Sequence, residues 1–427
     1  MVYTTKFYLI FQEREDVDYA SFCSVMREIQ FKVRKFKNYA SSVQFSYLQN
    51  KLKYKEEHGT FPKDEDILNG NNLRNSLYHL ATETIPQLNT ANASSISEDC
   101  YKHFKQDAKK IMAGEKSIAS YGTNQPIILH NKSMKLKETE DGKTYITISL
   151  FSNLGKKEFK LSSGQVEFEI WHKCESSQEI THKCVTGEYK VCASSLKYDK
   201  NKKMWELAFC YSFPTKENTL DENKILGLDL GVSIPIVAAI SNEYKRWFFN
   251  GHEIQSFRNK TEAMRKEMLR ARVQCGNGSV GHGIKSKVKS VDKLGHRIAN
   301  FRNTKNHAWA REIINIALKN NCGIIQMEDL SGISSNDAPK FLKNWTYYDL
   351  QQKIKYKAEA NGINVVFIDP KNTSRRCSKC GYISPDNRPS QSEFCCQKCG
   401  YKENADYNAA RNIATKDIDT IIKNYKE

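Results

Sequence analysis

The apolar and polar positions of this chain change from a helical period to a strand period after about residue 115. Before that point, apolar residues recur every three or four positions, which places them on one helix face: Phe22, Val25, Met26, Ile29, Val33 and Phe36. A second helix is expected to reach Glu57 and to stop at Gly59, with two more over residues 73–85 and 95–113. We therefore expect a helical lobe over residues 16–115. Its polar and basic faces suit contact with nucleic acid or another subunit, although solvation alone also explains them.

Residues 126–214 show the alternation that is typical of a sheet. The dipeptide Asp141-Gly142 predicts a hairpin between residues 134–138 and 145–150, and alternation recurs over residues 166–170 and 205–211. Residues 3–11 also have the composition of a strand and could join this sheet, which would make the helical lobe an insertion. Several short antiparallel strands indicate a small barrel or sandwich, and we expect a β-barrel domain over residues 1–15 and 116–214.

Two His-Lys-Cys triplets in this β-rich region allow a metal site. Residues two apart on a strand share a face, so a His₂Cys₂ zinc site is geometrically possible, formed by His172, Cys174, His182 and Cys184. Their spacing is not that of a zinc knuckle, and β-rich segments often carry such residues for packing. We favour the packing interpretation.

After a polar linker at residues 215–223, the pattern becomes that of a mixed α/β layer. Residues 224–240, KILGLDLGVSIPIVAAI, predict a buried strand, a turn at Gly231 and a second strand, and residues 244–249 predict a third. Later strands are expected at residues 322–328 and 363–368, on either side of a helix over residues 340–361, and a last helix begins at Asp406. This order predicts a fold of the RNase H type over residues 224–372 and 406–427.

Three acidic residues occupy comparable positions in that order. Asp229 lies inside the first strand, Glu328 ends a later strand, and Asp406 opens the last helix. A carboxylate in an apolar strand is costly unless it is paired or bound to metal, although backbone donors can also satisfy it. Clustered carboxylates normally hold Mg²⁺ or Mn²⁺, and two such ions ~4 Å apart can support phosphodiester cleavage. The sequence therefore predicts a metal-dependent site.

The strongest local signal is a pair of Cys-x-x-Cys motifs. Cys377 and Cys380, then fifteen residues, then Cys396 and Cys399 have the spacing of a four-thiolate zinc site. The neighbouring Cys395 fits the spacing less well. Four thiolates leave no open position on the ion, so the expected Zn²⁺ is structural and defines a module over residues 373–405.

The charge of the chain favours a polyanionic partner. The 66 Lys and Arg against 49 Asp and Glu give a formal net charge of +17, which attracts nucleic acid. Residues 257–311 contain 14 Lys or Arg and three Asp or Glu, so their helices are candidates for phosphate contacts. The Gly-rich loop at residues 276–283 lacks the Gly-Lys-Ser/Thr ending of a P-loop, and we interpret it as a flexible lid.

Cysteine usage and hydropathy indicate the compartment. The 13 cysteines are mostly scattered singly, which fits a reducing compartment and one metal site. The N-terminus does not resemble a signal peptide, and no run approaches the ~20 apolar residues that cross a bilayer. We expect a soluble cytoplasmic protein with no membrane partner.

Five motifs together resemble those of a known family, the miniature type V-F CRISPR effector nucleases (the Cas-twelve-f family), and of the related TnpB proteins of insertion sequences. The motifs are GLDLG at 227–231, QMEDL at 326–330, NWTYYDLQQKI at 344–354, TSRRCSKCG at 373–381 and NADYNAARN at 404–412. They cover the C-terminal half. The N-terminal half is similar in layout, with a helical recognition lobe inserted into a wedge domain, and this layout favours the CRISPR effectors.

The resemblance implies an RNA-guided DNA endonuclease with a single RuvC site formed by Asp229, Glu328 and Asp406. It implies that Arg388 lies near the scissile phosphate, although by charge alone Arg388 could be a surface residue. The cysteine module would bind target DNA, a guide RNA would pair with the target strand, and the protein would read a short T-rich flanking motif. The resemblance also implies two protein copies on one guide RNA, as an asymmetric homodimer in a prokaryotic cell. The alternatives are a TnpB-type nuclease and a non-catalytic zinc-ribbon protein that binds nucleic acid.

Overall fold

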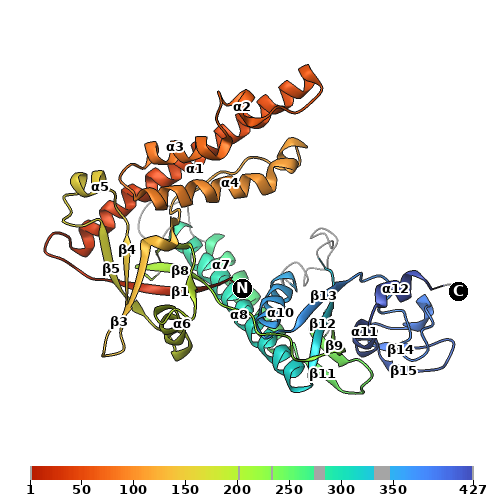
Figure 1. Cartoon of the computed structure of the whole chain (residues 1–427). Helices are drawn as coiled ribbons and strands as arrows, with labels where there is room; N and C mark the ends of the chain where they lie inside the picture. The colour runs from red at the N-terminus through yellow and green to blue at the C-terminus, as the bar shows by residue number, and fades with distance from the viewer. Residues whose placement is uncertain (1, 201, 232–233, 274–283, 331–346, 426–427) are drawn as a thin grey trace. The chain divides into compact units, whose positions relative to one another are not determined.

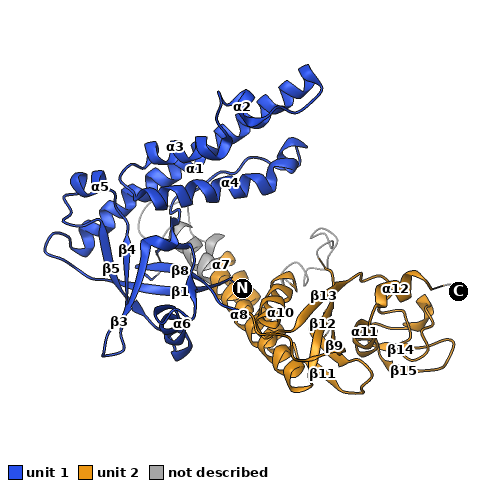
Figure 2. Ribbon diagram, in the orientation of Figure 1, with its two compact units in different colours: residues 1–214 blue, residues 215–427 orange. Residues whose placement is uncertain are grey.

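The computed structural model describes residues 2–200, 202–231, 234–273, 284–330 and 347–425. The chain divides into two units, Met1–Pro214 and Thr215–Glu427 (Figure 2). The division falls at the start of the predicted linker, and the first strand of the second unit begins inside that linker, at Asp221. No described helix combines the length and the apolar character needed to cross a membrane.

The first unit begins with one strand and a lobe of helices (Figure 1). The helices are α1 (Tyr19–His58), α2 (Asp64–Ile67), α3 (Leu73–Thr84) and α4 (Thr90–Met112). The Asp18 side chain caps α1 by accepting from the Ser21 N–H, and Gly59 ends it in the left-handed conformation at φ 74°. The prediction of two helices before Gly59 is wrong, because residues 19–58 contain neither Gly nor Pro to interrupt one helix of 40 residues.

The sheet of the first unit confirms the predicted strands and their alternation. Its strands are β1 (Val2–Phe11), β2 (Ile127–Leu129), β3 (Met134–Glu138), β4 (Thr144–Ser149), β5 (Gln165–Trp171), β6 (Lys190–Val191), β7 (Ser194–Asp199) and β8 (Met204–Ser212). The hydrogen-bonded order is β2-β7-β8-β1-β5-β4-β3, with β6 beside β8. The N-terminal strand β1 therefore joins this sheet, at its centre. The described strands do not close into a barrel, so the β-barrel prediction is not confirmed.

Aromatic packing joins α1 to this sheet. Phe22 on α1 stacks on Phe11 of β1 at 4.5 Å between ring centroids, and it meets Phe168 of β5 and Trp205 of β8 edge-on. All four side chains are buried. Two short helices complete the unit, α5 (Asn153–Glu158) and α6 (Glu175–Val185), together with the 3-10 turn Asn131–Ser133.

The second unit contains the predicted mixed sheet of five strands. They are β9 (Asp221–Asp229), β10 (Ile236–Ile240), β11 (Arg246–Phe249), β12 (Cys322–Glu328) and β13 (Asn364–Ile368), in the order β11-β10-β9-β12-β13. The pairs among β11, β10 and β9 are antiparallel, whereas β12 runs parallel to both β9 and β13. The parallel pairs bring the carboxyl ends of β9 and β12 to one edge of the sheet.

Helices cover both faces of this sheet. They are α7 (His252–Val273), α8 (Ile284–Lys319), α10 (Tyr347–Ala360), α11 (Ala405–Ile413) and α12 (Ile418–Lys423). Ile313 of α8 and Ile354 of α10 share one core with Leu226 and Leu228, whereas Tyr407 and Ala410 of α11 pack with Val237 and Ala239 on the other face. The Gly-rich loop at residues 276–283 and the first part of the helix expected from residue 340 lie outside the described residues.

Helix α11 approaches β9 at Gly227. A Cβ atom at this position would lie 2.3 Å from the Ala414 backbone nitrogen and 2.4 Å from the Ala410 carbonyl oxygen. Only the absence of a side chain permits this distance, because backbone atoms cannot move aside as a flexible side chain can. Gly227 therefore fixes how closely α11 lies on the sheet.

We predict that Gly227→Ala lowers the free energy of unfolding by at least about 3 kcal/mol, or prevents folding of the second unit, because it overpacks this contact. The matched control is Gly295→Ala in α8, where an added Cβ meets nothing within 4 Å. Alanine is favoured over glycine by about 1 kcal/mol inside a helix, so this control should unfold at the same or a higher temperature. Thermal unfolding followed by circular dichroism compares the two, and equal stability would contradict the prediction.

Candidate functional site

The first two predicted acids end neighbouring parallel strands. Asp229 is the last residue of β9 and Glu328 is the last residue of β12. The register pairs Leu228 with Met327. Asp229 and Glu328 are the next residues of the two strands, so they lie at the same level of the sheet. Parallel strands present their carboxyl ends at one sheet edge, which is where ligands bind in open α/β sheets. The sequence positions alone predicted this juxtaposition.

The third acid reaches this edge from α11. Asp406 lies in the first turn of the helix, whose N-cap Asn404 accepts a hydrogen bond from the Tyr407 N–H at 3.0 Å. Asp406 as a whole is 8% exposed, and its Oδ2 lies 3.9 Å from the place of a Cβ on Gly231, in the turn after β9. The close packing of α11 at Gly227 therefore brings Asp406 to the end of β9.

The three carboxylates interact electrostatically. The pKa of Asp229 is raised well above its ordinary value, first by burial and then by the negative charges of Glu328 and Asp406. Burial also raises the pKa of Glu328 and of Asp406. The three do not qualify as a compact metal-binding group, since among the described residues only four cysteines have ligand atoms all within 4.8 Å of one another. A cluster of negative charges in a desolvated site favours the binding of cations.

Arg388 supplies positive charge to this cluster. Its guanidinium donates a hydrogen bond to Asp406 Oδ1 at 3.1 Å and another to the Gln391 carbonyl at 2.6 Å. The positive charge lowers the pKa of Asp406, Glu328 and Asp229 and so opposes the effect of burial. This contact places Arg388 beside Asp406, while its expected position near the scissile phosphate stays a prediction.

Three further side chains support the acids and were missed by sequence reasoning. The Thr373 hydroxyl donates to Glu328 Oε1 at 2.5 Å, and Gln351 donates to the Glu328 carbonyl at 2.7 Å. The Tyr347 hydroxyl donates to the Gly231 carbonyl. Tyr347 and Gln351 are buried and lie four residues apart on α10. A sequence signal did exist, because polar residues at helical spacing on the apolar face of a helix need buried partners.

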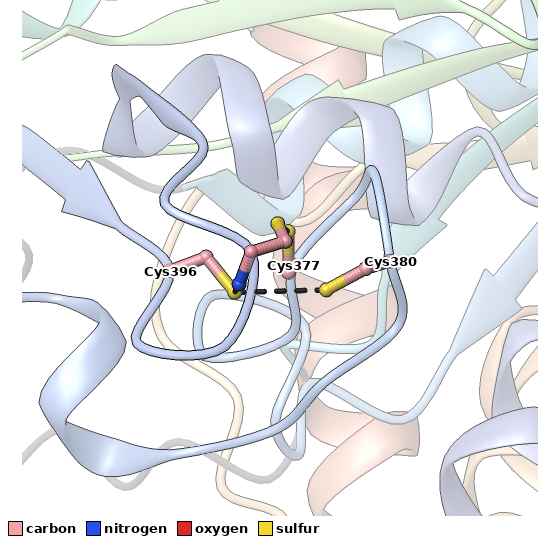
Figure 3. Close-up of side chains that lie close together, drawn as sticks. Cys377, Cys380 and Cys396 are labelled. Atoms are coloured by element: carbon pink, nitrogen blue, oxygen red, sulfur yellow. Dashed lines mark hydrogen bonds between the residues drawn. The ribbon is translucent and has the colours of Figure 1, made fainter.

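The four predicted cysteines come together. Cys377 and Cys396 are buried, and Cys380 and Cys399 are exposed. Cys377 Sγ lies 3.7 Å from Cys399 Sγ, and Cys380 Sγ lies 3.6 Å from Cys396 Sγ (Figure 3). Four thiolates at about 2.3 Å from a tetrahedral zinc ion would be about 3.8 Å apart, so the donor set and its spacing fit zinc. Cys395 lies in β14 (Glu393–Cys395) and does not join the group.

Each half of the cysteine group is the same local structure. The sequences CSKCGY and CQKCGY both turn at a glycine with positive φ, which is 81° at Gly381 and 67° at Gly400. The glycine N–H donates to the first cysteine's carbonyl in both halves, at 2.9 and 3.0 Å. Side chains at these φ values are strained, so glycine is required for the turn. The strand β15 (Lys402–Asn404) pairs with β14 beside this group.

Two buried asparagines connect the cysteine module to α11. Asn408 donates to the Arg376 carbonyl at 2.9 Å and accepts from the Ser378 N–H at 3.0 Å. Asn412 donates to the carbonyls of Thr373 and Arg376 and accepts from the Arg376 guanidinium. Both asparagines are fully buried and lie on one helix face. The module is therefore attached to the same helix that carries Asp406.

The second metal possibility, in the first unit, is not formed. Cys174 caps α6, and His182 and Cys184 lie within that helix instead of on a strand. His172 contacts the hydroxyls of Thr144 and Ser177, and His182 contacts Glu138 at 2.8 Å. Among the described residues these four do not form a metal-binding group, and both Cys174 and His182 are exposed.

Known proteins resemble this chain in sequence. The family model described as Cas12f1-like, TNB domain matches residues 347–413, which include the cysteine module and α11. The CRISPR-associated endodeoxyribonuclease Cas12f1 of Sulfoacidibacillus thermotolerans is 39% identical over 407 residues, or 95% of this chain and 96% of that protein. This chain belongs to the Cas12f1 family. A TnpB-like protein of Aquifex aeolicus is 35% identical over 96 residues, but these cover only 21% of this chain and 31% of that protein.

The fold agrees with this assignment. A solved cryo-EM structure of a Cas12f1–sgRNA–target DNA complex matches 97% of this chain and 99% of that chain with a TM-score of 0.69, at 20% identity. The predicted resemblance to the type V-F effectors is thus confirmed, and the near-complete coverage distinguishes Cas12f1 from the shorter TnpB match.

We predict that the purified chain contains one zinc ion, measured by mass spectrometry of the metal content. Cys396→Ser should remove it, because this change takes away a buried thiolate ligand. The matched control is the adjacent Cys395→Ser, which should keep the full zinc content. A chelator should lower the unfolding temperature of the wild type and of the control. Zinc retained by Cys396→Ser and lost by Cys395→Ser would contradict the assignment.

Proposed function

We propose that this member of the Cas12f1 family is an RNA-guided DNA endonuclease of a CRISPR system, and that Asp229, Glu328 and Asp406 form its nuclease site. The observation that carries the proposal is the meeting of three acids from distant parts of the chain at one sheet edge. The near full-length similarity to a CRISPR-associated endodeoxyribonuclease supports the same conclusion. In this proposal the second unit is an RNase H-like (RuvC) domain with an inserted zinc module at residues 373–405.

The donor set suits hard divalent cations, since three carboxylates offer only oxygen ligands. Asp229, Glu328 and Asp406 would hold two Mg²⁺ or Mn²⁺ ions, which would supply activation of a water and stabilisation of the leaving oxygen. The protein's own groups prepare this site. Thr373 and Gln351 hold Glu328 at the strand end, and Tyr347 fixes the turn after Asp229. The pKa of each acid is raised, first by burial, and a bound cation would favour the ionised form of each.

Arg388 is proposed to contact the scissile phosphate. Its guanidinium pairs with Asp406, and its side chain is 26% exposed. A planar guanidinium has several donors, so contact with one carboxylate leaves others for a phosphate oxygen. If bound cations neutralised the acids, Arg388 would pair less strongly with Asp406 and its charge would be available to the substrate.

The partners are proposed to be a guide RNA and target DNA, as in the solved complex of the similar protein. The net charge of +17 supports binding to both. Base pairing would supply sequence specificity, with a short T-rich flanking motif read by the protein. The first unit would act as a wedge domain (residues 1–15 and 116–214) with an inserted recognition lobe (residues 16–115). The matches to Sulfoacidibacillus thermotolerans and Aquifex aeolicus proteins support a prokaryotic setting.

A purely binding protein is the second candidate. A zinc-containing, basic chain could bind nucleic acid without cleaving it. Burying three acids at one sheet edge is costly, however, and gives a binding protein no advantage toward a polyanion. The acid cluster therefore favours catalysis over binding alone.

We predict that Asp229→Ala and Glu328→Ala each reduce DNA cleavage by about 10⁴-fold or more, because each removes a ligand of the reacting centre. Binding of guide RNA and target DNA should persist, since neither acid attracts phosphate. The matched control is Glu222→Gln at the opposite end of β9, which should cleave normally. Cleavage of labelled target DNA and gel-shift binding measure the two effects. Cleavage that continues in either alanine variant would refute the proposed site.

We predict that Arg388→Ala lowers the cleavage rate by about 100-fold or more, because a positive group near the transition state is lost. Arg388→Lys should recover part of the rate, since the charge remains but the planar fork does not. The zinc content and the affinity for target DNA should stay unchanged, which separates this role from a structural one. An unchanged cleavage rate in Arg388→Ala would contradict the proposed role and favour the alternative that Arg388 is a surface residue.

We predict that the active complex contains two copies of this chain on one guide RNA. Light scattering coupled to gel filtration, with the protein and RNA contributions separated by absorbance, measures this ratio directly. A complex of one chain and one RNA that cleaves at the full rate would contradict the proposed homodimer.

A further inference from the structure

A concave site of the first unit lies between α1 and the strands β7 and β8. We call it the α1 pocket. Its volume is about 430 Å³, within the usual range for ligand sites. Residues from three parts of the chain form it, namely the first half of α1, the segment at residues 123–124, and the strand ends near residues 198–205.

Hydrogen bonds fix the wall of the α1 pocket. Gln30 is 7% exposed, and its amide donates to Asn124 Oδ1 at 3.2 Å and to the Gln125 carbonyl at 3.0 Å. Asn124 in turn donates to the Tyr198 carbonyl at 3.1 Å and adopts a positive φ of 64°. These bonds join the helix, the segment and the strand, so the pocket is formed before any ligand arrives. A preformed site loses less entropy on binding.

The lining combines aromatic rings with positive charge. Tyr198 and Trp205 lie in it, and Phe31 lines it from α1 with 62% of its surface exposed. The buried indole N–H of Trp205 has no hydrogen-bond partner within the part of the chain that the structure describes. Such a buried donor is costly, and a ligand with an acceptor atom would relieve it. An exposed Phe ring and an unpaired donor are both unfavourable in the absence of a ligand.

The charged residues of the lining are all basic. Arg27, Arg34 and Lys200 line the α1 pocket, and no acidic residue does. Across the described residues, none of the three has an ion-pair partner, and only Arg34 has a recorded hydrogen bond, from Nε to the Tyr121 carbonyl at 3.3 Å. Their guanidinium and ammonium groups remain available to phosphate oxygens.

The exposed face of α1 continues this pattern. Arg27, Phe31, Lys35 and Tyr39 follow one another at four-residue spacing and are exposed, with 57% of the Tyr39 surface accessible. They form one stripe along the helix, which Figure 1 shows as the long helix of the first unit. Basic and aromatic side chains in alternation are the usual surface for a single nucleic-acid strand, because the former contact phosphates and the latter stack on bases.

We propose that the α1 pocket binds one unpaired nucleotide of a nucleic-acid strand. Its base stacks on Phe31, with Tyr198 and Trp205 beneath, and its flanking phosphates contact Arg27, Arg34 and Lys200. A base presents ring nitrogens and carbonyl oxygens as acceptors for a donor such as the Trp205 N–H. The proposal rests on the proposed function only in taking nucleic acid as the ligand. A guide RNA and a displaced DNA strand share this chemistry.

Photocrosslinking distinguishes the two sources. The full-length chain is irradiated with 15-nucleotide single strands that carry 5-iodouracil, one of RNA and one of DNA, and the attached peptides are identified by mass spectrometry. Crosslinks to Phe31, Tyr198 or Trp205 with either probe support the proposal. The probe that gives the higher crosslinking yield shows whether the pocket prefers RNA or DNA. Crosslinks confined to other parts of the chain in both arms would overturn it.

Affinity measurements test the stacking. Phe31→Ala should weaken binding of the better probe at least about fivefold, since stacking on an aromatic ring contributes about 1–3 kcal/mol per base. The matched control is Phe45→Ala, an exposed phenylalanine on the same helix that does not line the pocket, which should bind as the wild type does. Equal affinity of the two variants overturns the proposal. So does a change of oligomeric mass in Phe31→Ala with unchanged affinity, because Phe31 would then contact protein.

The charged groups are tested by salt dependence. Arg27→Gln and Lys200→Gln should each reduce the slope of log affinity against log salt by about 0.7, the value for one phosphate contact on a single strand. An unchanged slope in both variants would show that neither side chain contacts a phosphate, which would overturn the proposed phosphate contacts. These assays need no cleavage, and Asp229→Ala should bind the probes as the wild type does. Failure of the pocket is thereby distinguished from failure of the nuclease site.

Discussion

The contact between the α11 backbone and Gly227 of β9 is the constraint on which the acid cluster depends. A Cβ at Gly227 would lie within 2.4 Å of two backbone atoms of the helix end, so this distance exists only because the strand has no side chain there. The same strand ends two residues later at Asp229, and the same helix begins with Asp406 in its first turn. One packing contact thus sets the separation of two acids that are 177 positions apart in the sequence.

The acid cluster explains why so many neutral donors surround it. Burial raises the pKa of each carboxyl, the negative charges of Glu328 and Asp406 raise the pKa of Asp229 further, and the positive charge of Arg388 opposes all three shifts. Thr373 and Gln351 bind Glu328 through its carboxylate and its carbonyl, which orients the side chain without neutralising it. Because these neutral groups orient Glu328 without cancelling its charge, the site keeps the negative charge that attracts cations.

Much of this arrangement could be predicted from the sequence, because its signals are local. Alternating apolar residues defined β3 and β4, and cysteine spacing with Gly381 and Gly400 defined the zinc module. The rest depends on contacts between distant residues. Nothing near Thr373 in the sequence indicates Glu328 as its partner. In the first unit, α6 occupies the region where strand residues could have formed a His₂Cys₂ site. The unbroken α1 was predicted as two helices, although residues 19–58 contain neither Gly nor Pro.

The zinc module and the acid site are coupled through α11. Asn408 and Asn412 bind the backbone of residues 373–378, immediately beside Cys377, and Thr373 from this same segment donates to Glu328. Loss of a zinc ion from Cys377 would remove one of the two restraints on this short segment and leave only the asparagine contacts. Asp229 lies on a central strand and does not depend on those contacts. The four cysteines and the two asparagines therefore help to hold Asp406 and Glu328 in place, although none of them belongs to the acid cluster.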